Sequence, residues 1–482
     1  MRAVLALDQG GHASRACLVD VHGRILATQQ VPIATAHGSA GEVEHDPQEI
    51  VASLQAAAAG VLRAAPELIV DAAGLATQRS TIVCFERGSG VALSSAISWQ
   101  DRRNEPWLAS FAPHAARIAE LTGLPLSPHY GVGKMRWCLD HLPAVQRARA
   151  RGELIIAPLA AYLAMRLTGG AALADPANAS RTLLFDSAQR DWSAELLRLF
   201  GIERAWLPAC TPTRTRHGVL RLGEAAARSQ PIELRAVTGD QSAIPFAFGA
   251  PDNACVYINL GTGAFLQRPL SVRPTDAAPL LASVLLSDRD HALYSLEGTV
   301  NGAGAAISRF AADSGVPESS LWRELEQRPP GGALPVYINA IGGLGSPYWR
   351  AEQRSYFIGE GSTLERFAAV VESILFLIAI NFDLMRHRGG ALARVIASGG
   401  LSRSDWLCRR LAALLGAPVL RGAQEATVLG VAALAAPELF GDARERRAQD
   451  SAEQRFEPGL LPPAELAALA ARRSRFDAAL SP

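Results

Sequence analysis

A repeated unit of strand, glycine turn and returning strand constrains the fold of this chain more than any other feature. The first copy spans 3–19, where an apolar run leads to Gly10–Gly11 and a second apolar run returns. The second copy spans 254–267, with its turn at Gly261–Thr262–Gly263. Continuous apolar runs of this length suit buried strands. We therefore expect two similar halves, each presenting a glycine hairpin.

The glycine turns have two interpretations. Glycines lack a Cβ and let backbone N–H groups approach an anion, so the two hairpins would face each other across a chain of phosphates. A tight hairpin turn is the commoner use of a Gly-Gly pair, and it requires no ligand. The sequence at Gly10–Gly11 fits both interpretations.

The length and charge of the chain limit its architecture and its partners. At 482 residues the chain exceeds what one core supports, so we expect two or more domains. The formal net charge is +1, with 47 Lys and Arg against 46 Asp and Glu, so no basic face is implied. Neither nucleic acid nor an anionic membrane is therefore an expected partner.

The cysteines and the apolar segments favour a cytoplasmic location. Six scattered cysteines form no C-x-x-C pair, which favours free thiols in a reducing compartment over a disulfide framework. The N-terminal residues lack the apolar segment and cleavage site of a signal peptide. No apolar run reaches 18 residues without a charged or amide side chain, so we expect no transmembrane helix.

Lysine is almost absent, which excludes two common ATP-using folds. Nearly all the positive charge is arginine, and Lys134 is the only lysine. A P-loop needs the lysine of its GK[ST] motif, and a protein-kinase fold needs a lysine on a strand. Lys134 lies in a segment, 131–141, that is predicted to be helical, so neither fold fits.

Local patterns predict further elements. A helix is expected after Asp46 as its N-cap, with Pro47 at the first helical position and Glu49 completing a capping box. The segment 177–182 is expected to be a polar turn. Further helices are expected at 223–228, at 300–310 and, long and apolar, at 365–385.

Asp240 lies near the middle of the chain, after a short apolar run and a glycine and before a helical pattern. An acid at such a strand-to-helix turn lies at the C-terminal edge of a sheet, where α/β proteins place ligands. Capping the helix is the commoner role of aspartate at this position. The alternative is a catalytic base at the mouth of a cleft between two similar halves.

Arg79, Trp99 and Arg102 lie near the ends of strands predicted at 68–76 and 97–101. An arginine binds hydroxyl or phosphate oxygens, and a tryptophan face lies against the C–H surface of a sugar. Surface ion pairing and a place in the core are the favoured explanations for any one of these residues alone.

Nine short motifs between residues 43 and 400 carry a resemblance to a known family. They are Val43–Pro47, Gln78–Arg79, Trp99–Arg103, Asn178–Thr182, Gly239–Gln241, Gly261–Gly263, Glu297–Gly298, Ala303–Ala305 and Gly399–Gly400. Their order and spacing resemble those of the FGGY carbohydrate kinases, the glycerol kinases most of all, over residues 2–436. The resemblance implies an α/β fold in which two actin-like ATPase (ribonuclease H-like) domains flank a central cleft.

The resemblance also implies the domain boundaries and the reaction. An N-terminal domain, 1–245, would hold the sugar or polyol and the catalytic base, and a C-terminal domain, 246–440, would hold most of the nucleotide site. Residues 441–482 would form a peripheral tail. Asp240 would be the general base, and positioned proton transfer of this kind contributes about 10²–10⁴ in rate. The implied substrate-binding residues are Arg79, Ser80, Trp99, His129, Asp240, Gln241 and Phe265.

The implied cofactors are ATP and Mg²⁺. Asp8 would help to hold Mg²⁺, through water, because Mg²⁺ prefers few carboxylates and retains waters. The glycine turns would cradle the phosphates, and later glycines would border the adenosine. The implied ATP-binding residues are Gly10, Gly11, His12, Ser14, Arg15, Gly261, Thr262, Gly304, Ser308, Gly400 and Ser404.

Four positions depart from the pattern of the family. Its first phosphate turn usually reads D-Q-G-T-T, whereas this chain has Gly11 and His12 in place of two hydroxyl donors, each worth about 1.5–3 kcal/mol. The Gly11 N–H, or a protonated His12, would have to take over their hydrogen bonds. Glycerol kinases have glutamate where this chain has Ser80, and an aromatic residue where it has His129. Ser80 leaves room for a larger polyol.

These observations predict ATP-dependent phosphorylation of a small sugar or polyol, a ketose or an alditol other than glycerol. One alternative is a catalytically weak member that binds a sugar or nucleotide as a sensor. Glycerol kinase itself is the other alternative, which Ser80 and His129 together disfavour. We expect a small-molecule partner and a homodimer or other homo-oligomer.

Overall fold

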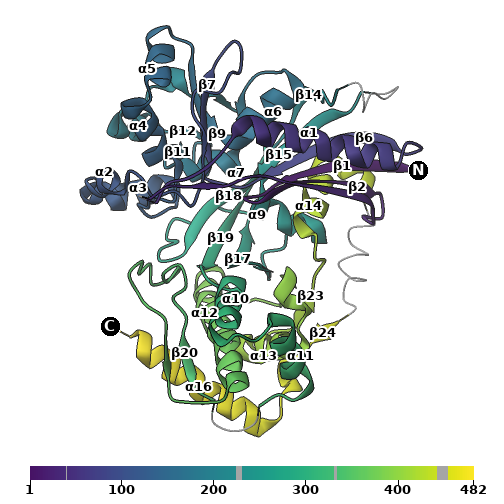
Figure 1. Cartoon of the computed structure of the whole chain (residues 1–482), viewed down its shortest axis with the longest axis vertical. Helices are drawn as coiled ribbons and strands as arrows, with labels where there is room; N and C mark the ends of the chain where they lie inside the picture. The colour runs from purple at the N-terminus through teal and green to yellow at the C-terminus, as the bar shows by residue number, and fades with distance from the viewer. Residues whose placement is uncertain (40, 224–230, 331–333, 442–453, 482) are drawn as a thin grey trace.

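The computed structural model describes residues 1–39, 41–223, 231–330, 334–441 and 454–481, which form two lobes (Figure 1). The first lobe is built on a six-stranded sheet with the strand order β14-β15-β6-β1-β2-β3. Its strands are β1 (Arg2–Gln9), β2 (Ala13–Asp20), β3 (Ile25–Pro32), β6 (Ile69–Thr77), β14 (Arg214–Val219) and β15 (Glu233–Gly239). The antiparallel meander β1–β2–β3 confirms the predicted strand, glycine turn and strand.

The second lobe repeats this sheet. Its strand order is β18-β19-β17-β16-β22-β23-β24. The strands are β16 (Cys255–Leu260), β17 (Ala264–Leu270), β18 (Leu281–Ser287), β19 (Ala292–Val300), β22 (Arg394–Ser398), β23 (Val419–Arg421) and β24 (Arg455–Phe456). In both sheets the first strand pairs antiparallel with the strand after the glycine turn and parallel with a later strand, β6 or β22. The predicted duplication is therefore present.

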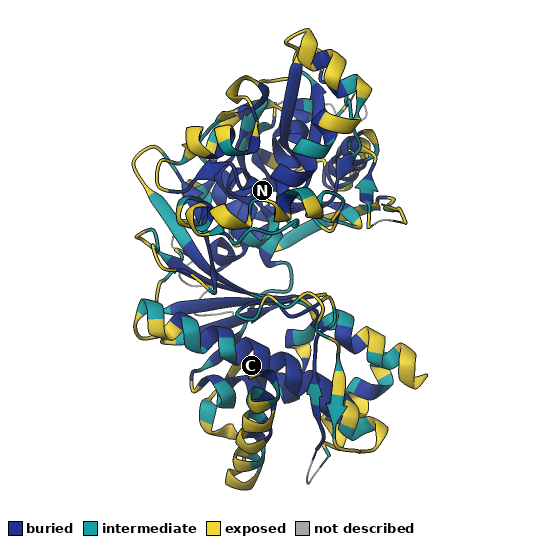
Figure 2. Ribbon diagram, turned by 90° about the vertical axis from the view of Figure 1, so that its left-hand side faces the viewer, coloured by how far each residue is buried: buried dark blue, intermediate teal, exposed yellow. Residues whose placement is uncertain are grey.

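Helices cover the sheets and carry the exposed surface, while the strands at the centre of each lobe are buried (Figure 2). In the first lobe α1 packs on β2 and β3, and α6 packs on β6 and β15. In the second lobe α12 packs on β17 and β19. The longer helices are α1 (Pro47–Ala64), α3 (Ala115–Thr122), α4 (Gly131–His141), α5 (Pro143–Ala150), α6 (Leu159–Thr168), α8 (Ala194–Phe200), α10 (Gly304–Ser314), α11 (Glu318–Gln327), α12 (Thr363–Gly389), α13 (Asp405–Leu415), α14 (Ala426–Ala435) and α16 (Pro463–Leu480).

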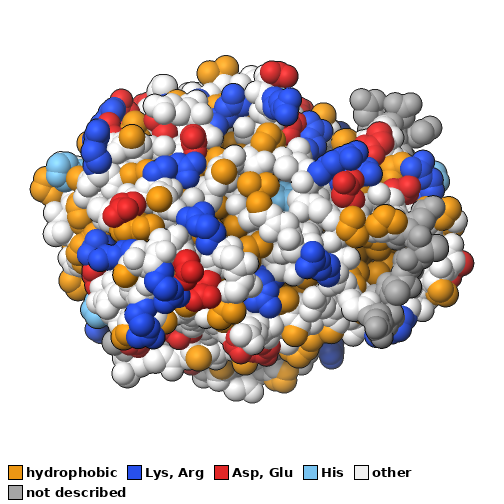
Figure 3. Space-filling model, turned by 90° about the horizontal axis from the view of Figure 1, so that it is seen from above, with side chains coloured by type: hydrophobic (Ala, Val, Ile, Leu, Met, Phe, Trp, Pro, Cys, Tyr) orange, Lys and Arg blue, Asp and Glu red, His pale blue; other side chains and the backbone are white. Residues whose placement is uncertain are grey.

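Smaller elements extend the first lobe beside its main sheet. A five-stranded sheet has the order β4-β5-β8-β7-β9. Its strands are β4 (Ala36–His37), β5 (Val43–His45), β7 (Ile82–Glu86), β8 (Ala96–Ile97) and β9 (Leu154–Pro158), and the short helices nearby are α2 (Glu105–Ala109), α7 (Pro176–Ala179) and α9 (Asp240–Ala243). On the face seen in Figure 3, basic and acidic side chains are interspersed, as the near-zero net charge led us to expect.

The long helix α12 is the core helix of the second lobe. Ser362 and Glu365 form a capping box at its N-terminus, where the Ser362 N–H donates to the Glu365 carboxylate at 2.7 Å. By length and composition alone α12 could cross a membrane, but 83% of its most apolar 18-residue window is buried inside the protein. The predicted long apolar helix at 365–385 is confirmed, and it packs between layers of the second lobe.

Helix α14 returns to the first lobe although it follows most of the second lobe in the chain. It packs on β1, β6 and β15, and Figure 1 shows it beside them. The approach is close, because a Cβ on Gly430 would lie 1.9 Å from the Ala243 carbonyl oxygen and a Cβ on Gly74 would lie 2.7 Å from the Val431 oxygen. Glycines at these two positions let the helix reach the sheet and α9.

The structure corrects three local predictions. Residues 177–182 are helical, because α7 is followed directly by a 3-10 turn at Ser180–Thr182. The helix predicted at 300–310 begins only at Gly304, because β19 continues to Val300. The Glu49 carboxylate accepts the Ala34 N–H at 3.0 Å, so it does not complete a capping box with Asp46. The helix predicted at 223–228 lies outside the described residues from 224 onward.

Candidate active site

Asp240 lies at the end of a central strand, where β15 ends at Gly239 and α9 begins. Its carboxylate accepts the Gln241 N–H at 2.6 Å, and its Oδ1 is 3.9 Å from Nε of Arg79. A Cβ on Gly239 would lie 2.6 Å from the Arg79 Cγ and Cδ atoms, so the stem of Arg79 crosses this glycine. The N-cap of α9 is Gly239, and Asp240 is the first helical residue rather than the cap.

The surroundings of Asp240 raise the proton affinity of its carboxylate. Burial raises the pKa of the Asp240 carboxyl above its ordinary value, and the Arg79 charge and the Gln241 hydrogen bond oppose that rise. A carboxylate with a raised pKa is a stronger proton acceptor, which is what a general base requires. The side chain is 27% exposed, so a ligand can reach it.

Glu297, on β19 of the second lobe, joins the two lobes at this site. Arg79 binds it in a bidentate pair, with Nη1–Oε1 at 3.1 Å and Nη2–Oε2 at 3.2 Å. Arg181 and Ser283 also donate to the same carboxylate. Burial alone would raise the pKa of Glu297, but the charges of Arg181 and Arg79 outweigh it and lower that pKa to about 2. Glu297 is therefore a fixed anion between two arginines.

Glu297 and Arg181 each belong to one of the nine motifs, but neither was among the predicted site residues. Both are buried, at 4% and 3% exposure. Buried charges are found paired, because an unpaired charge in a protein interior is costly. The available sequence signal was Arg181 itself. It lies in the segment 173–185, which has many apolar residues, and a buried arginine there requires an acidic partner.

The rings of Trp99 and His129, two of the predicted substrate-binding residues, lie side by side. Their ring centroids are 5.3 Å apart and their planes are tilted by 58°. Burial lowers the pKa of His129 well below its ordinary value, and the nearby charges of Lys134, Arg181 and Arg79 lower it further. His129 is therefore a neutral imidazole, with one nitrogen that donates a hydrogen bond and one that accepts. Arg102, by contrast, forms a surface ion pair with Glu105.

Ser80 combines an unusual backbone with an unsatisfied hydroxyl. Its φ is 65°, a left-handed conformation that costs a residue with a Cβ on the order of 1 kcal/mol or more. The residue is 3% exposed, and its Oγ has no hydrogen-bond partner within the described part of the chain. Most buried polar groups are hydrogen-bonded, so this hydroxyl next to Arg79 keeps unused hydrogen-bonding capacity.

A chain of buried hydrogen bonds runs from the Trp99 side of the site to the first glycine turn. The backbone N–H of Trp99 donates to Thr81 Oγ1 at 3.1 Å, and the Thr81 hydroxyl donates to Gln78 Oε1 at 3.1 Å. The Gln78 amide donates to Gln9 Oε1 at 3.2 Å and to the Gly10 carbonyl at 3.4 Å. The two predicted parts of the site are therefore joined by one polar network.

Asp8, near the end of β1, lies close enough to Asp240 for the two carboxylates to interact. Burial and the Asp240 charge raise the pKa of Asp8 to about 7, and Arg15 opposes the rise. Among the described residues no group of three or more His, Cys, Asp or Glu is placed to hold a metal. A pair of carboxylates suits a hard cation such as Mg²⁺ that keeps part of its water shell.

The first glycine turn is held by its own backbone. The Gly10 N–H donates to the Ala13 carbonyl at 3.0 Å, and the Thr35 hydroxyl donates to the Gly11 carbonyl at 3.3 Å. His12 is exposed at the tip of this turn. Two predicted phosphate ligands have other partners, because the buried Ser14 hydroxyl accepts from Ser53 at 2.7 Å and Arg15 is ion-paired with Glu425.

The second glycine turn packs against the start of α10. The N–H groups of Gly304 and Ala305 donate to the Gly261 and Thr262 carbonyls at 2.9 and 3.0 Å. A Cβ on Gly399 would lie 2.6 Å from the Leu260 carbonyl oxygen, so the turn before Gly400 also meets this hairpin. The structure therefore brings the predicted residues Gly261, Thr262, Gly304 and Gly400 to one end of β16.

The other predicted residues have protein partners. Exposed Ser308 donates to Glu318 at 3.0 Å, and Ser404 donates to Glu326 at 2.5 Å while capping α13. The side-chain oxygen Oε1 of Gln241 accepts a hydrogen bond from the Asn259 side-chain amide at 3.2 Å. Phe265 lies on β17 beside the second turn, where a Cβ on Gly263 would contact its ring at 3.4 Å.

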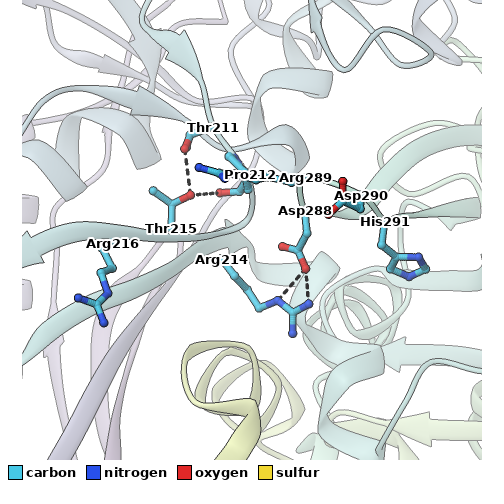
Figure 4. A pocket seen from close by; sticks show the side chains of 9 residues that line it. All are labelled: Thr211, Pro212, Arg214, Thr215, Arg216, Asp288, Arg289, Asp290 and His291. Atoms are coloured by element: carbon cyan, nitrogen blue, oxygen red, sulfur yellow. Dashed lines mark hydrogen bonds and ion pairs between the residues drawn. The ribbon is translucent and has the colours of Figure 1, made fainter.

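A cavity of about 660 Å³ lies away from these residues, between β14 and the turn that joins β18 to β19 (Figure 4). Arg214 and Asp288 both line it and form an ion pair with each other. Arg216, also in its wall, lies 3.6 Å from Glu233. Two of its three arginines therefore already have acidic partners, and the cavity contains none of the predicted site residues.

Comparison with known proteins identifies relatives over nearly the whole chain. Models of the FGGY family of carbohydrate kinases match residues 3–255, as the N-terminal domain, and 256–438, as the C-terminal domain. A glycerol kinase of Acidovorax ebreus (strain TPSY) is 34% identical over 492 residues and covers 98% of both chains. One from Thermus brockianus is 36% identical over 451 residues, covering 90% of this chain and 89% of the relative.

Solved structures show the same architecture. Plasmodium falciparum glycerol kinase with ADP superposes with a TM-score of 0.90 at 21% identity, covering 100% of this chain and 99% of the other. A xylulose kinase from Rhodospirillum rubrum superposes with a TM-score of 0.83 at 21% identity, covering 99% and 98%. These likenesses confirm the expected two-domain α/β fold.

Proposed function

Because this chain belongs to the FGGY family of carbohydrate kinases, we propose that it phosphorylates a hydroxyl of a small ketose or alditol other than glycerol. The chain is a carbohydrate kinase, and therefore a phosphotransferase with an alcohol group as acceptor. The family implies ATP as phosphoryl donor. The proposed acceptor is a ketose or an alditol larger than glycerol.

The unsatisfied hydroxyl of Ser80 is the observation that carries the choice of acceptor. A buried Oγ without a partner gains a hydrogen bond when a ligand hydroxyl binds beside Arg79. Serine is shorter than glutamate, which supports a larger or differently oriented polyol than glycerol at this end of the site. Neutral His129, against Trp99, offers one further donor and one acceptor to such a substrate.

Asp240 is the proposed base of the reaction. Its carboxylate accepts the proton of the attacking hydroxyl as the oxygen approaches the γ-phosphorus. Arg79 lies between Asp240 and Glu297 and orients the base without neutralising it, because both Nη atoms are bound to Glu297. Phosphoryl transfer depends mainly on alignment and on neutralisation of charge, which this cluster and the glycine turns would supply.

Asp8 is the proposed ligand of Mg²⁺, with Asp240 beside it. The mutual repulsion of two partly buried carboxylates is relieved when a cation binds between them, which fits the raised pKa of Asp8. The bound ion would neutralise negative charge on the phosphates. We further infer that 1–245 carries the acceptor site and the base, that 246–440 carries most of the nucleotide site, and that the glycine turns border the phosphates.

A panel assay tests this proposal. The purified protein is incubated with Mg-ATP and, separately, with glycerol, erythritol, tetroses, ketopentoses and ketohexoses, and ADP release is measured. Turnover of a larger polyol or ketose at a higher kcat/KM than glycerol is the expected result. Glycerol as the best acceptor would contradict the choice of acceptor, and ADP release with none of them would contradict the kinase proposal.

Replacing the base gives the first prediction. Asp240→Asn keeps the size of the side chain and removes the proton acceptor, so turnover should fall by about 10²–10⁴. The affinity for the sugar, measured by calorimetry, should change by no more than a few-fold. Asp46→Asn at the exposed helix cap is the matched control and should leave turnover unchanged. Near-normal turnover of Asp240→Asn would show that the base lies elsewhere.

A catalytically weak sensor is the second candidate, and one observation favours it. The first phosphate turn lacks two hydroxyl donors and Arg15 is bound to Glu425, so this turn offers fewer groups to phosphate than the family pattern. Binding of a sugar or nucleotide by calorimetry, without ADP release from any acceptor in the panel, would support this candidate.

A further inference from the structure

Lys134, the only lysine of the chain, is buried beside the site in an unusual setting. It is 2% exposed and lies in the first turn of α4. Its Nζ donates to three successive carbonyl oxygens, those of Pro128 at 3.1 Å, His129 at 2.7 Å and Tyr130 at 3.2 Å. An ammonium group has three N–H donors, so all of them are used on one segment of backbone.

This arrangement is costly. The positive charge lies near a helix N-terminus, where the helix dipole disfavours cations, and it is removed from water. Burial lowers the pKa of Lys134 to about 7, Asp101 opposes that effect and Arg103 adds to it. An apolar side chain would fill the same space without this cost. We therefore infer that the role of Lys134 is to hold the three carbonyls of residues 128–130.

The segment that Lys134 holds carries His129. The imidazole lies against Trp99 on one side and, edge-on at 85° and 5.3 Å, against Tyr130 on the other. Ser127 and Pro128 precede His129, and α4 begins two residues after it. Only a few backbone dihedrals therefore set the direction of the His129 side chain. Fixing the carbonyls of 128, 129 and 130 fixes those dihedrals.

We propose that Lys134 is a positioning residue for the acceptor: by binding three successive carbonyls it holds His129 against Trp99, and so sets the affinity for the sugar or polyol without touching it. This inference rests on the proposed function of the site. A lysine that only stabilised the fold would lower stability when replaced but would leave the affinities for sugar and ATP unchanged in the folded protein.

Binding measurements separate these roles. Lys134→Met keeps the stem and removes the donors, and the calorimetric Kd and the KM for the acceptor should rise about 10–100-fold, the change expected when one or two hydrogen bonds to the acceptor are lost. The KM for ATP should stay within about twofold. Lys134→Arg retains charge and donors and should recover part of the loss. Arg136→Met, two residues along α4 and paired with Asp140, is the control expected to change neither constant.

An unchanged acceptor Kd and KM in folded Lys134→Met would overturn the inference. Equal losses for acceptor and ATP would do the same, because they indicate general damage to the fold. Sugar binding by the wild type without ADP release would defeat the kinase proposal alone, and the Kd comparison would still decide the role of Lys134. No sugar binding by the wild type would overturn both.

The single lysine allows a second test that does not depend on activity. The same ε-amine in the urea-unfolded protein is the reference. Limited acetylation with acetic anhydride near pH 8, followed by peptide mass spectrometry, gives the rate at Lys134 in the folded and in the unfolded protein. Lys134, which is 2% exposed, should react at least about tenfold more slowly in the folded protein, because reaction requires local opening of the 128–130 segment, and a bound acceptor should slow it further. Equal rates in the folded and unfolded protein, or no effect of a bound acceptor, would overturn the inference.

Discussion

Arg79 lies between two carboxylates with different proposed roles. Asp240 is the proposed base and must be free to accept a proton, whereas Glu297 is held as an anion by ion pairs. Glu297 accepts both Nη atoms, whereas Asp240 is 3.9 Å from Nε. The pKa of Glu297 is lowered to about 2 and that of Asp240 is raised, so the two acids next to one arginine have opposite properties. The different contacts with Arg79 therefore distinguish Glu297, a structural anion, from Asp240, the proposed base.

Removal of the Glu297 charge should destabilise the protein strongly. Glu297→Gln leaves Arg181 buried without this counter-charge and leaves Arg79 with only the Asp240 carboxylate, 3.9 Å from its Nε, which should lower the free energy of unfolding by about 3–5 kcal/mol. Urea denaturation measures this change. Glu105→Gln at an exposed ion pair is the control and should cost less than about 1 kcal/mol. Similar losses in both variants would contradict the role given to Glu297.

The pKa of Asp8 predicts how stability changes with pH. Its folded-state pKa of about 7 lies above the ordinary value of about 4, so the folded protein holds a proton that the unfolded chain releases. This group's contribution therefore falls as pH rises from 4 to 7 and is lost above 7. Asp8→Asn should be equal to the wild type near pH 4 and about 1–3 kcal/mol more stable near pH 8. Denaturant titrations of both proteins at the two pH values test this, and a constant difference would contradict it.

Some residues of the site could be predicted from the sequence and others could not. Asp240, Arg79 and Trp99 were found because each follows a strand and belongs to a short motif. Glu297 comes from β19, whose partners depend on the pairing of distant strands, so its position beside Arg79 cannot be read locally. The unsatisfied Oγ of Ser80 is likewise a property of the folded chain.

At the scale of elements, the end of α12 depends on one buried side chain from β17. Arg268 is 1% exposed and donates to the Met385 carbonyl at 2.7 Å and to the Asn253 carbonyl at 2.8 Å. A helix leaves its last carbonyls without partners, and here a guanidinium supplies the missing donors. It ties the core helix of the second lobe to the strand beside the second glycine turn.

Arg268→Met should therefore lower the free energy of unfolding by about 3 kcal/mol, since several buried carbonyls lose a charged donor. Arg386→Met, on the same helix but half exposed and paired with Asp383, should cost less than about 1 kcal/mol. Thermal or urea unfolding of the two variants provides the comparison. If both variants lose the same stability, capping by Arg268 does not account for the result.

Elements with a strong local pattern were predictable, and those fixed by tertiary contacts were not. The meander β1–β2–β3 and helix α12 follow from apolar periodicity and length. The segment 177–182 looked like a turn because it is rich in Asn, Ser and Thr, yet Asp175 caps it as α7 through the Asn178 N–H at 3.0 Å. Glu49 faces the Ala34 N–H, which no local rule places next to it.

At the scale of the molecule, the lobes are joined through Glu425, which precedes α14 and pairs with Arg15 on β2. The pair connects the strand after the first phosphate turn to the segment that returns from the second lobe. A phosphate that binds Arg15 would have to displace the Glu425 carboxylate. The ion pair is partly exposed, at 30% and 43% of the two side chains, so it is weak enough to exchange.

Glu425→Gln should accordingly tighten nucleotide binding. Removal of the competing carboxylate frees Arg15, and the Kd for Mg-ATP should fall by up to about fivefold, the equivalent of an exposed ion pair. Isothermal calorimetry measures the change. Glu438→Gln, an exposed acid 3.6 Å from Arg235, is the control expected to leave the Kd unchanged. Weaker binding in Glu425→Gln would indicate that this acid supports the nucleotide site.

The duplication of the two sheets was predictable from the glycine turns because it repeats along the chain. The return of α14 to the first lobe was not, since its apolar sequence would suit the core of either lobe. Only the packed structure shows Gly430 against Ala243 and Gly74 against Val431.

This return has a consequence for biosynthesis. The face of β1 and β6 that α14 covers remains open while the whole second lobe is being translated, because 426–435 leaves the ribosome last among the elements of the first lobe. At typical elongation rates the delay after β15 is on the order of ten to forty seconds. During that time an apolar surface of the nascent first lobe is available to chaperones, and a fragment that ends before α14 would keep that surface exposed permanently.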